Sequence, residues 1–168
     1  DFCDWYIEIS KVALNGDDEE LKTRKQENLI WILDQILRLL HPIMPFVTEK
    51  LWLSMPHDGK SIMVAQYPET HKEFENKEAD SQMAFLIEVI KAVRNIRMEV
   101  NAPMSSPIDI MIQIDDDKNK SVLDNNAEYV ENFLHPKALS VAADIEAPKL
   151  AKTAVIPGAQ IFVPLTEL

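Results

Sequence analysis

The sequence predicts an α+β protein that is mostly α: a helical bundle over residues 1–103, followed by a small α+β subdomain over residues 104–168. Two observations support this fold class. Apolar residues recur at helical spacing through much of the first hundred residues, whereas isoleucines alternate with other residues over 108–114. The period changes between Pro103 and Pro107, which we expect to close the last helix of the bundle.

The bulk composition excludes several classes of protein. The chain has 168 residues, 46% of them hydrophobic, which is enough to bury a core. Its formal net charge of −11 argues against a free-standing nucleic-acid binder, since such proteins usually carry a basic surface. Any contact with nucleic acid must therefore be local.

Cysteine and histidine usage indicates the compartment. The single cysteine, Cys3, has no partner for an internal disulfide and is expected to be a small core residue. The four histidines show no metal-ligand spacing, and no run approaches the ~18 apolar residues of a membrane span. We therefore expect a cytoplasmic protein that binds no membrane.

The first two helices are predicted from apolar stripes and end signals. The first covers about residues 1–14 and ends at Asn15-Gly16; the second begins at Asp17 or Asp18 and stops at His41-Pro42. The chain opens directly on an apolar stripe with no cap or leader before it. We interpret it as a piece of a longer protein.

A corner follows in the stretch LHPIMPFVTEKLW. Pro42 and Pro45 each restrict the preceding residue and lack an N–H, so we expect a kinked connection and then a short helix over 46–55. The large apolar side chains of this helix, Phe46, Leu51 and Trp52, are expected to pack inward, with Trp52 as core rather than as a ligand-stacking ring. A short strand-like patch covers 62–65.

His41 precedes this corner. A lone histidine before proline at a helix end is more often a cap or a packing residue than a catalyst, and no Ser, Cys or Asp stands at a spacing typical of a catalytic partner.

The helix expected over 79–103 carries an unusual line of cations. Arg97 falls within its apolar face, Arg94 lies at the edge of that face, and Lys91 lies beyond it. A guanidinium in such a place needs a partner. That partner is either a carboxylate of a neighbouring helix or a phosphate or base edge, for which the planar fork of arginine is suited.

The elements of the α+β subdomain are predicted from the spacing of apolar residues after Pro107. A strand over 108–114 is followed by Asp115–Asp117, which we interpret as a solvated turn, because the glycine and distant glutamate of a calcium loop are missing. A helix over 121–133 and a strand over 139–143 come next. A last strand over 153–164 is interrupted by a turn at Pro157-Gly158.

The sequence has none of the common catalytic motifs. With only three glycines it has no Gly-rich phosphate loop, and we find no nucleophile elbow, zinc spacing or paired-carboxylate helix. We therefore assign no catalytic residue and no metal ligand. Two classes remain: a recognition module that acts through Lys91, Arg94 and Arg97, and a structural or protein-interaction module whose cations are satisfied internally. Salt-dependent binding to RNA would separate them.

Three stretches, DFCDWYIEISK at 1–11, LLHPIMPFVTEKLW at 39–52 and IKAVRNIRMEVNAP at 90–103, resemble the anticodon-binding region of the valyl-tRNA synthetases, a family of class I aminoacyl-tRNA synthetases. The middle stretch is similar also in the isoleucyl and leucyl enzymes, and the first one favours the valyl family over the alternative isoleucyl one. The closing IPGAQIFVPL resembles the strand pair that precedes the C-terminal coiled coil of the family, which is absent here.

The resemblance implies a role in recognition. It implies that earlier helices of the bundle lie upstream, and that the catalytic and editing domains of the same polypeptide bind ATP and Mg²⁺ and aminoacylate tRNA(Val), while this part uses no cofactor and receives the anticodon stem-loop. Arg94 and Arg97, helped by Lys91, are then candidates to face the RNA. The corner with His41, Pro42 and Pro45 is a secondary candidate.

Overall fold

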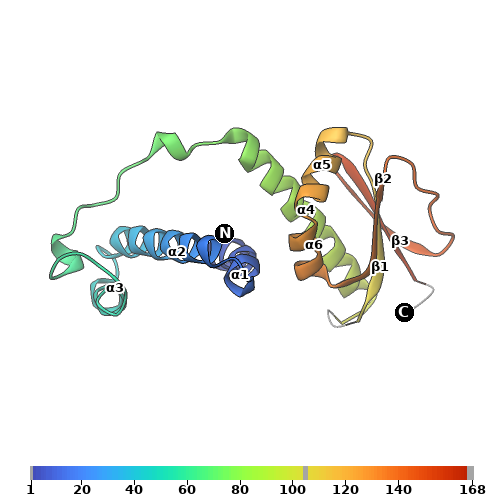
Figure 1. The fold of residues 1–168 in the computed structure, drawn as a ribbon. Helices are drawn as coiled ribbons and strands as arrows, with labels where there is room; N and C mark the ends of the chain where they lie inside the picture. Colours follow the sequence, from blue (N-terminus) through green and yellow to red (C-terminus); the bar gives the residue numbers. More distant parts are fainter. Residues whose placement is uncertain (1, 104–105, 166–168) are drawn as a thin grey trace. The chain divides into compact units, whose positions relative to one another are not determined.

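The chain forms two compact units in a computed structural model that describes residues 2–103 and 106–165 (Figure 1). The first unit is Asp1–Glu75 and the second is Asn76–Leu168. The division assigns the long helix after residue 76 to the unit that holds the sheet. The boundary between the two compact units at residues 75/76 therefore differs from the boundary at residues 103/104 that the change of sequence period suggests. The division into functional domains at 103/104 stays a prediction.

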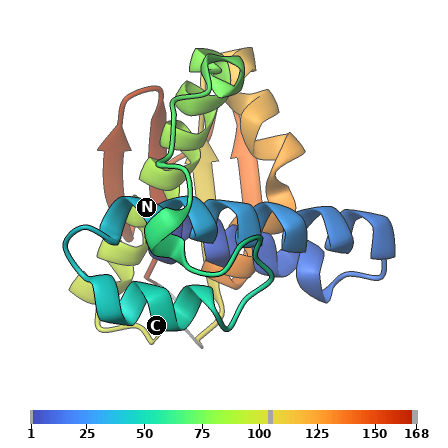
Figure 2. The ribbon, with the colours of Figure 1, turned by 90° about the vertical axis from the view of Figure 1, so that its left-hand side faces the viewer.

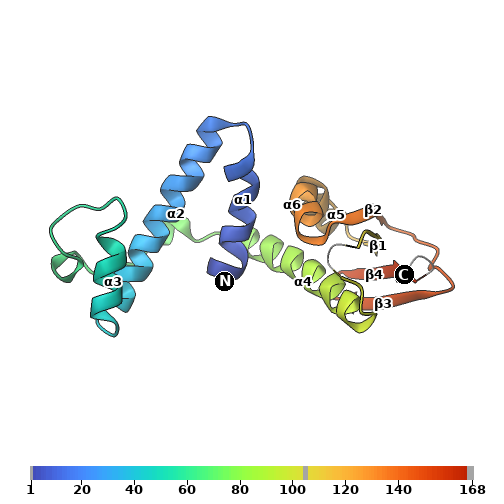
Figure 3. The ribbon, with the colours of Figure 1, turned by 90° about the horizontal axis from the view of Figure 1, so that it is seen from below.

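The regular elements described in the first unit are all helices or helical turns. Its elements are a π-helical turn η1 (Phe2–Tyr6), helices α1 (Ile7–Asn15), α2 (Glu19–Leu40) and α3 (Pro45–Trp52), and the 3₁₀ turns η2 (Ile62–Val64) and η3 (Lys72–Phe74). Asp18 caps α2, since its Oδ1 accepts hydrogen bonds from the backbone N–H groups of Glu20 and Leu21, both at 3.0 Å. Figure 3 shows α1 and α2 as the two arms of a helical hairpin.

The buried core of the first unit is small and centres on Trp52. This side chain is fully buried and packs with Leu37 and Ile62. Its indole Nε1 donates to Asp34 Oδ1 at 2.6 Å, and Asp34 Oδ2 lies 2.9 Å from Arg38 Nε. The buried polar group of the indole is thus satisfied, as its burial requires. The prediction that Trp52 is a core residue is confirmed.

Other predictions for the first unit are wrong. Phe46 is 90% exposed and Leu51 is exposed too, because the inner face of α3 is taken by Thr48 and Trp52, one helical turn apart. Cys3 is exposed on η1 rather than buried. The strand-like patch over 62–65 forms the 3₁₀ turn η2, which the side chain of Ser61 caps.

The second unit is one helix, a strand, two short helices and three more strands. Its elements are α4 (Lys77–Glu99), β1 (Ile108–Gln113), α5 (Asp117–Asn125), α6 (Ala127–Leu134), β2 (Pro136–Ala142), β3 (Ala151–Ile156) and β4 (Ala159–Pro164). The strand order is β2-β1-β4-β3. β1 and β2 are parallel and are joined through α5 and α6, whereas β4 is antiparallel to both β1 and β3.

The core of the second unit lies between α4 and the sheet. Residues of β1 alternate between buried and half-buried positions, with Ile110 and Ile112 fully buried, so the predicted isoleucine face is confirmed. Val89 and Val93 of α4 are buried as completely. Figures 1, 2 and 3 show α4, α5 and α6 on one face of the sheet. Burial of these side chains is the main source of stability for such a layer.

Several boundaries in the second unit differ from the sequence prediction: α4 ends at Glu99 rather than at residue 103, and β2 begins at Pro136 rather than at residue 139. The helix expected over 121–133 is two helices, since the chain turns at Asn126. The acidic run before it is a cap rather than only a solvated turn, because Asp116 Oδ1 accepts a hydrogen bond from Lys118 N at 3.2 Å. The interruption predicted at Pro157-Gly158 is confirmed: it is the turn of the hairpin β3–β4 and requires the positive φ of 85° at Gly158.

Candidate nucleic-acid interface

The three cations of α4 lie on a line that runs from the core to the solvent. Arg97 is 1% exposed, Arg94 is half-buried, and Lys91 is exposed. They are spaced three residues apart, so each is displaced around the helix axis from the one before. The increase in exposure from Arg97 to Lys91 that the helical spacing predicts is therefore present.

Arg97 donates to backbone carbonyls. Its Nη1 lies 3.0 Å from Pro103 O and 2.8 Å from Ser106 O, and its Nη2 lies 2.6 Å from Leu134 O. Among the described residues none of its acceptors is a carboxylate, so the expected pairing with a carboxylate of a neighbouring helix is wrong. Burial lowers the pKa of the Arg97 guanidinium, but an arginine side chain remains protonated in proteins.

These three bonds give Arg97 a structural role. Pro103 and Ser106 belong to the connection between α4 and β1, and Leu134 is the last residue of α6. The carbonyls at a helix C-terminus lack intrahelical donors and carry the negative end of the helix dipole. Arg97 thus ties this connection and the end of α6 to α4. A direct contact between its guanidinium and RNA would require these hydrogen bonds to break.

Arg94 and Lys91 lie nearer the surface. The guanidinium carbon of Arg94 lies 5.2 Å from the centroid of the Phe133 ring, a cation–π arrangement across α4 and α6. Lys91 Nζ lies 3.3 Å from Glu88 Oε1 in an exposed pair one turn apart. Such a pair contributes little to stability, so it yields readily to another anion. Of the three cations, Lys91 is the one whose charge lies in solvent.

The corner between α2 and α3 forms the second candidate site. The N–H groups of Ile43 and Met44 both donate to Leu40 O at 2.9 Å, which turns the chain at the end of α2. Pro45 then begins α3 at a position where its missing N–H costs nothing. The predicted kink at Pro42 and Pro45 is present, and it brings His41 against the first turn of α3.

A chain of hydrogen bonds fixes the orientation of the His41 ring. Its Nδ1 lies 2.8 Å from Thr48 Oγ1, and Thr48 Oγ1 lies 2.7 Å from Met44 O. A carbonyl oxygen has no proton, so the buried Thr48 hydroxyl must donate to Met44 O. Nδ1 of His41 must then donate to the hydroxyl, which leaves Nε2 of the neutral ring as an acceptor. This tautomer is assigned from the hydrogen-bond geometry.

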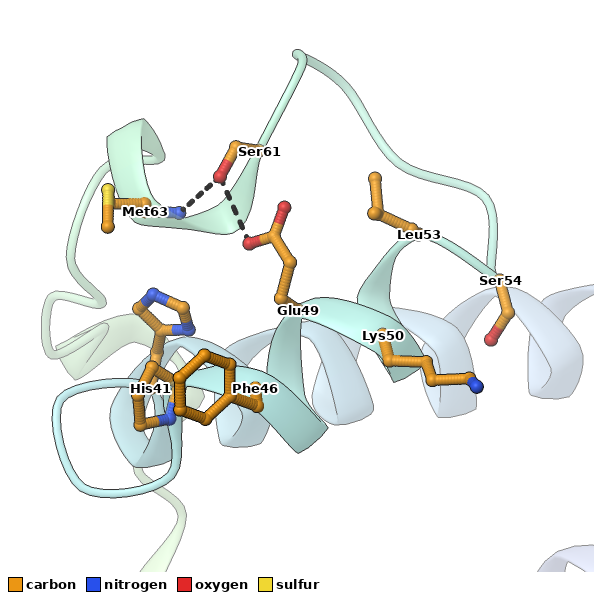
Figure 4. A pocket seen from close by; sticks show the side chains of 9 residues that line it. His41, Phe46, Glu49, Lys50, Leu53, Ser54, Ser61 and Met63 are labelled. Carbon is orange, nitrogen blue, oxygen red and sulfur yellow. Dashed lines mark hydrogen bonds between the residues drawn. The ribbon is translucent and has the colours of Figure 1, made fainter.

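A cavity of about 490 Å³ opens beside this ring. Its lining comes from the corner, one face of α3 and the turn η2: His41, Pro45, Phe46, Glu49, Lys50, Leu53, Ser54, Ser61 and Met63. Figure 4 shows His41 and Phe46 on one side of the cavity and Ser61 and Met63 on the other. Phe46 is 90% exposed and Met63 is 74% exposed. The volume is within the range of small-molecule sites.

The polar groups of the cavity are mainly acceptors. Ser61 Oγ donates to Glu49 Oε2 at 3.0 Å and accepts from Met63 N at 3.2 Å, while Ser54 Oγ donates to Leu51 O at 2.7 Å. These hydroxyl protons are therefore already used. Glu49 Oε1 accepts no hydrogen bond from any residue within 2–103 or 106–165. The cavity presents a carboxylate oxygen and the acceptor nitrogen of His41.

Of the three corner residues that the sequence suggests as secondary candidates, His41 and Pro45 line the cavity and Pro42 does not, and the other lining residues are not predicted. Phe46 was assigned to the core, and Glu49, Ser61 and Met63 were not singled out. The spacing of Phe46, Glu49 and Leu53 along one helical face was the available signal. The position of η2 opposite that face depends on tertiary packing, which the sequence pattern did not reveal.

The described residues contain no group of three His, Cys, Asp or Glu side chains that could hold a metal ion. Within the same residues, no helix is long and apolar enough to cross a membrane.

Comparison with known proteins places the chain in a family. A model described as the anticodon-binding domain of tRNA ligase matches residues 1–112, so the match extends through the first unit, α4 and most of β1. The chain belongs to the family of anticodon-binding domains of tRNA ligases.

Individual relatives match over the whole chain. It is 98% identical to the valine–tRNA ligase of Lactobacillus johnsonii, 56% identical to that of Latilactobacillus sakei and 45% identical to that of Bacillus cereus, in each case over all 168 residues. The chain spans 19% of the length of each of these relatives.

Proposed function

We propose that this chain is the anticodon-binding part of a valine–tRNA ligase and positions tRNA(Val) by its anticodon stem-loop. The observation that carries the proposal is the family match over residues 1–112, joined to full-chain similarity with relatives named valine–tRNA ligase. Those names favour the valyl over the isoleucyl alternative. Aminoacylation, with its ATP and Mg²⁺, is assigned to the catalytic part of the full-length polypeptide, in the cytoplasm.

We propose that α4 contacts RNA through its exposed side only. Lys91 is the candidate for a phosphate contact, because its ammonium lies in solvent and its pair with Glu88 is weak. Arg94 is the candidate for a contact at the edge of that surface. Arg97 acts indirectly, by holding the connection after α4 and the end of α6 in place.

The function is tested with the full-length polypeptide and tRNA(Val) transcripts. Replacing the anticodon of the transcript is expected to raise the KM for tRNA, because the bases of a single-stranded loop carry the sequence readout. Valine-dependent exchange of pyrophosphate into ATP, in the absence of tRNA, serves as the control and should not change. An unaltered KM for the anticodon-replaced transcript would contradict the proposal.

The contact of Lys91 is tested by the salt dependence of binding. Lys91→Met is expected to weaken binding of tRNA(Val) and to make the slope of log Kd against log salt shallower by roughly 1, because one phosphate contact is lost. Lys118→Met is the matched control, since Lys118 is an exposed, singly paired lysine of the same unit. Equal slopes for wild type and Lys91→Met would assign α4 a structural role alone.

A further inference from the structure

We propose that the cavity at the corner between α2 and α3 binds one unpaired nucleobase that carries an exocyclic amino group: adenine, cytosine or guanine. The inference rests on the proposed function, because it names the part of the RNA that this cavity would take. It is carried by the hydrogen-bonding groups of the cavity, its walls and its charge.

The hydrogen-bonding groups select for a donor. In the neutral ring of His41, Nε2 is an acceptor, because Nδ1 donates to Thr48 and the proton of Thr48 is used by Met44 O. Glu49 Oε2 is held by the Ser61 hydroxyl, and its other oxygen is available to a ligand. The N–H groups of an amino group can donate to either of these acceptors. Uracil has carbonyl oxygens in place of an amino group, and these would face acceptors unfavourably.

The walls of the cavity fit a flat ring. Phe46 is an aromatic ring with 90% of its surface exposed, and Met63 is a polarizable side chain with 74% exposed. Figure 4 shows Phe46 on α3 and Met63 on η2, with the ring of His41 between them. Bases of single-stranded RNA stack on exposed aromatic side chains, and thioethers make favourable contacts with aromatic rings. In the free protein these apolar side chains are exposed to water, which is unfavourable in free energy. A base stacked on them would remove part of that apolar surface from water.

The charge of the rim fits a nucleotide rather than a free base. Lys50 lies one helical turn after Phe46, is exposed and belongs to the lining of the cavity, and its side chain extends away from His41 and Met63 (Figure 4). Its ammonium therefore lies at the rim, where it can bind a phosphate next to a base in the cavity. An apolar peptide helix, the alternative occupant of such a surface, would bury Glu49 and Lys50 without partners, which is costly.

The experiment couples a protein change to a nucleotide change. Kd values are measured by filter binding for the full-length polypeptide and tRNA(Val) transcripts in which single amino-bearing bases of the anticodon loop lose that group: uracil for cytosine, purine for adenine, hypoxanthine for guanine. For the base in the cavity, the wild-type protein is expected to lose at least tenfold in affinity. In Glu49→Gln and His41→Phe the same nucleotide change is expected to cost less than threefold, because its partner has been removed.

Phe46→Ala tests the stacking wall. It is expected to weaken binding of the unmodified transcript roughly tenfold, because the stacked base loses its aromatic partner. Phe74→Ala is the matched control, since Phe74 is a phenylalanine of the same unit with 67% of its surface exposed and lies outside the cavity. It should change the Kd less than twofold. Phe46 is exposed and Glu49→Gln keeps an acceptor for Ser61, so both variants should fold.

The outcomes separate this inference from the proposed function. Two results would show that the cavity does not bind a base and would overturn the inference. In the first, the wild-type protein discriminates against anticodon-replaced tRNA but Phe46→Ala binds the unmodified transcript as tightly as wild type does. In the second, every amino deletion raises the Kd by the same factor in wild type and in Glu49→Gln. An equal loss in Phe74→Ala would overturn it too. Failure of the wild-type protein to discriminate at all would instead contradict the proposed function.

Discussion

The two units of the chain bury their apolar side chains to very different degrees. In the first unit, Leu37, Trp52 and Ile62 are the buried hydrophobic residues, and all other buried hydrophobic residues of the described chain lie in the second unit. Large exposed hydrophobic side chains are distributed the other way: many lie on α2, α3 and the segment after them, few on the second unit. The second unit is therefore built as a packed layer, and the first presents apolar surface.

This difference suggests a division of labour. A sheet covered by helices on one face, with fully buried isoleucines and a guanidinium bonded to three carbonyls, is a rigid scaffold. An exposed apolar surface with a cavity and a few oriented polar groups is typical of a binding surface. We therefore expect substitutions in the second unit to affect mainly stability, and exposed substitutions in the first to affect mainly binding.

The largest effect on stability is expected at Arg97. Arg97→Met should lower the free energy of unfolding of the second unit by about 3 kcal/mol, because one buried and two part-buried carbonyls lose their donor. Urea denaturation of the 168-residue chain, followed by hydrogen exchange of β1 and α6 amides, measures it. Lys91→Met, on the same helix but exposed, should change the free energy by less than about 0.5 kcal/mol. Equal effects would show that Arg97 is not a structural tie.

A smaller effect is expected at Trp52 in the first unit. Trp52→Phe should cost about 2 kcal/mol, because it leaves a void in a small core and removes the donor to Asp34. Hydrogen exchange of α3 should accelerate while that of β1 is unchanged. Trp31→Phe is the control, since Trp31 is exposed, and it should leave the exchange of α3 unaltered. If Trp52→Phe left α3 exchange unchanged, the three-residue core would not be what stabilises the first unit.

The smallest effects come from a matched pair of helix caps. Asp18 caps α2 in the first unit and Asn76 caps α4 in the second, each accepting two backbone N–H bonds at 3.0–3.1 Å. Asp18→Ala and Asn76→Ala should each cost about 1 kcal/mol. Amide exchange in the first turn of each helix reports the loss. If the units are independent, each variant should accelerate exchange only in its own unit; acceleration in both would indicate one cooperative unit.

Local patterns predicted most of the fold. The isoleucine alternation of β1, the stripe of α2 with its end at the His-Pro step, and the burial of Trp52 all follow from spacing within a single element. The errors arise where a distant segment decides the outcome. Phe46 and Leu51 are apolar but lie outside the buried face of α3, which Thr48 and Trp52 occupy. The spacing of residues within the helix does not indicate which of its faces other segments cover.

The same limit applies to the candidate site. The helical spacing places Arg97 within an apolar face, and its guanidinium is therefore expected to have a hydrogen-bond partner. This expectation is confirmed, but one of the acceptors is the carbonyl of Leu134, 37 residues away in sequence. The cavity beside His41 depends on η2, a turn that the sequence pattern read as a strand. The sequence pattern thus predicts the helices that carry the candidate site but not the tertiary contacts around it.

Hydrogen exchange of the full-length polypeptide, with and without tRNA(Val), tests the division of labour most directly. The account predicts that tRNA slows exchange in peptides covering the corner and α3, residues 41–63, and in the exposed turns of α4 around Lys91, while β1 and β4 exchange equally slowly in both states. Protection confined to the strands of the second unit, with residues 41–63 unchanged, would contradict it.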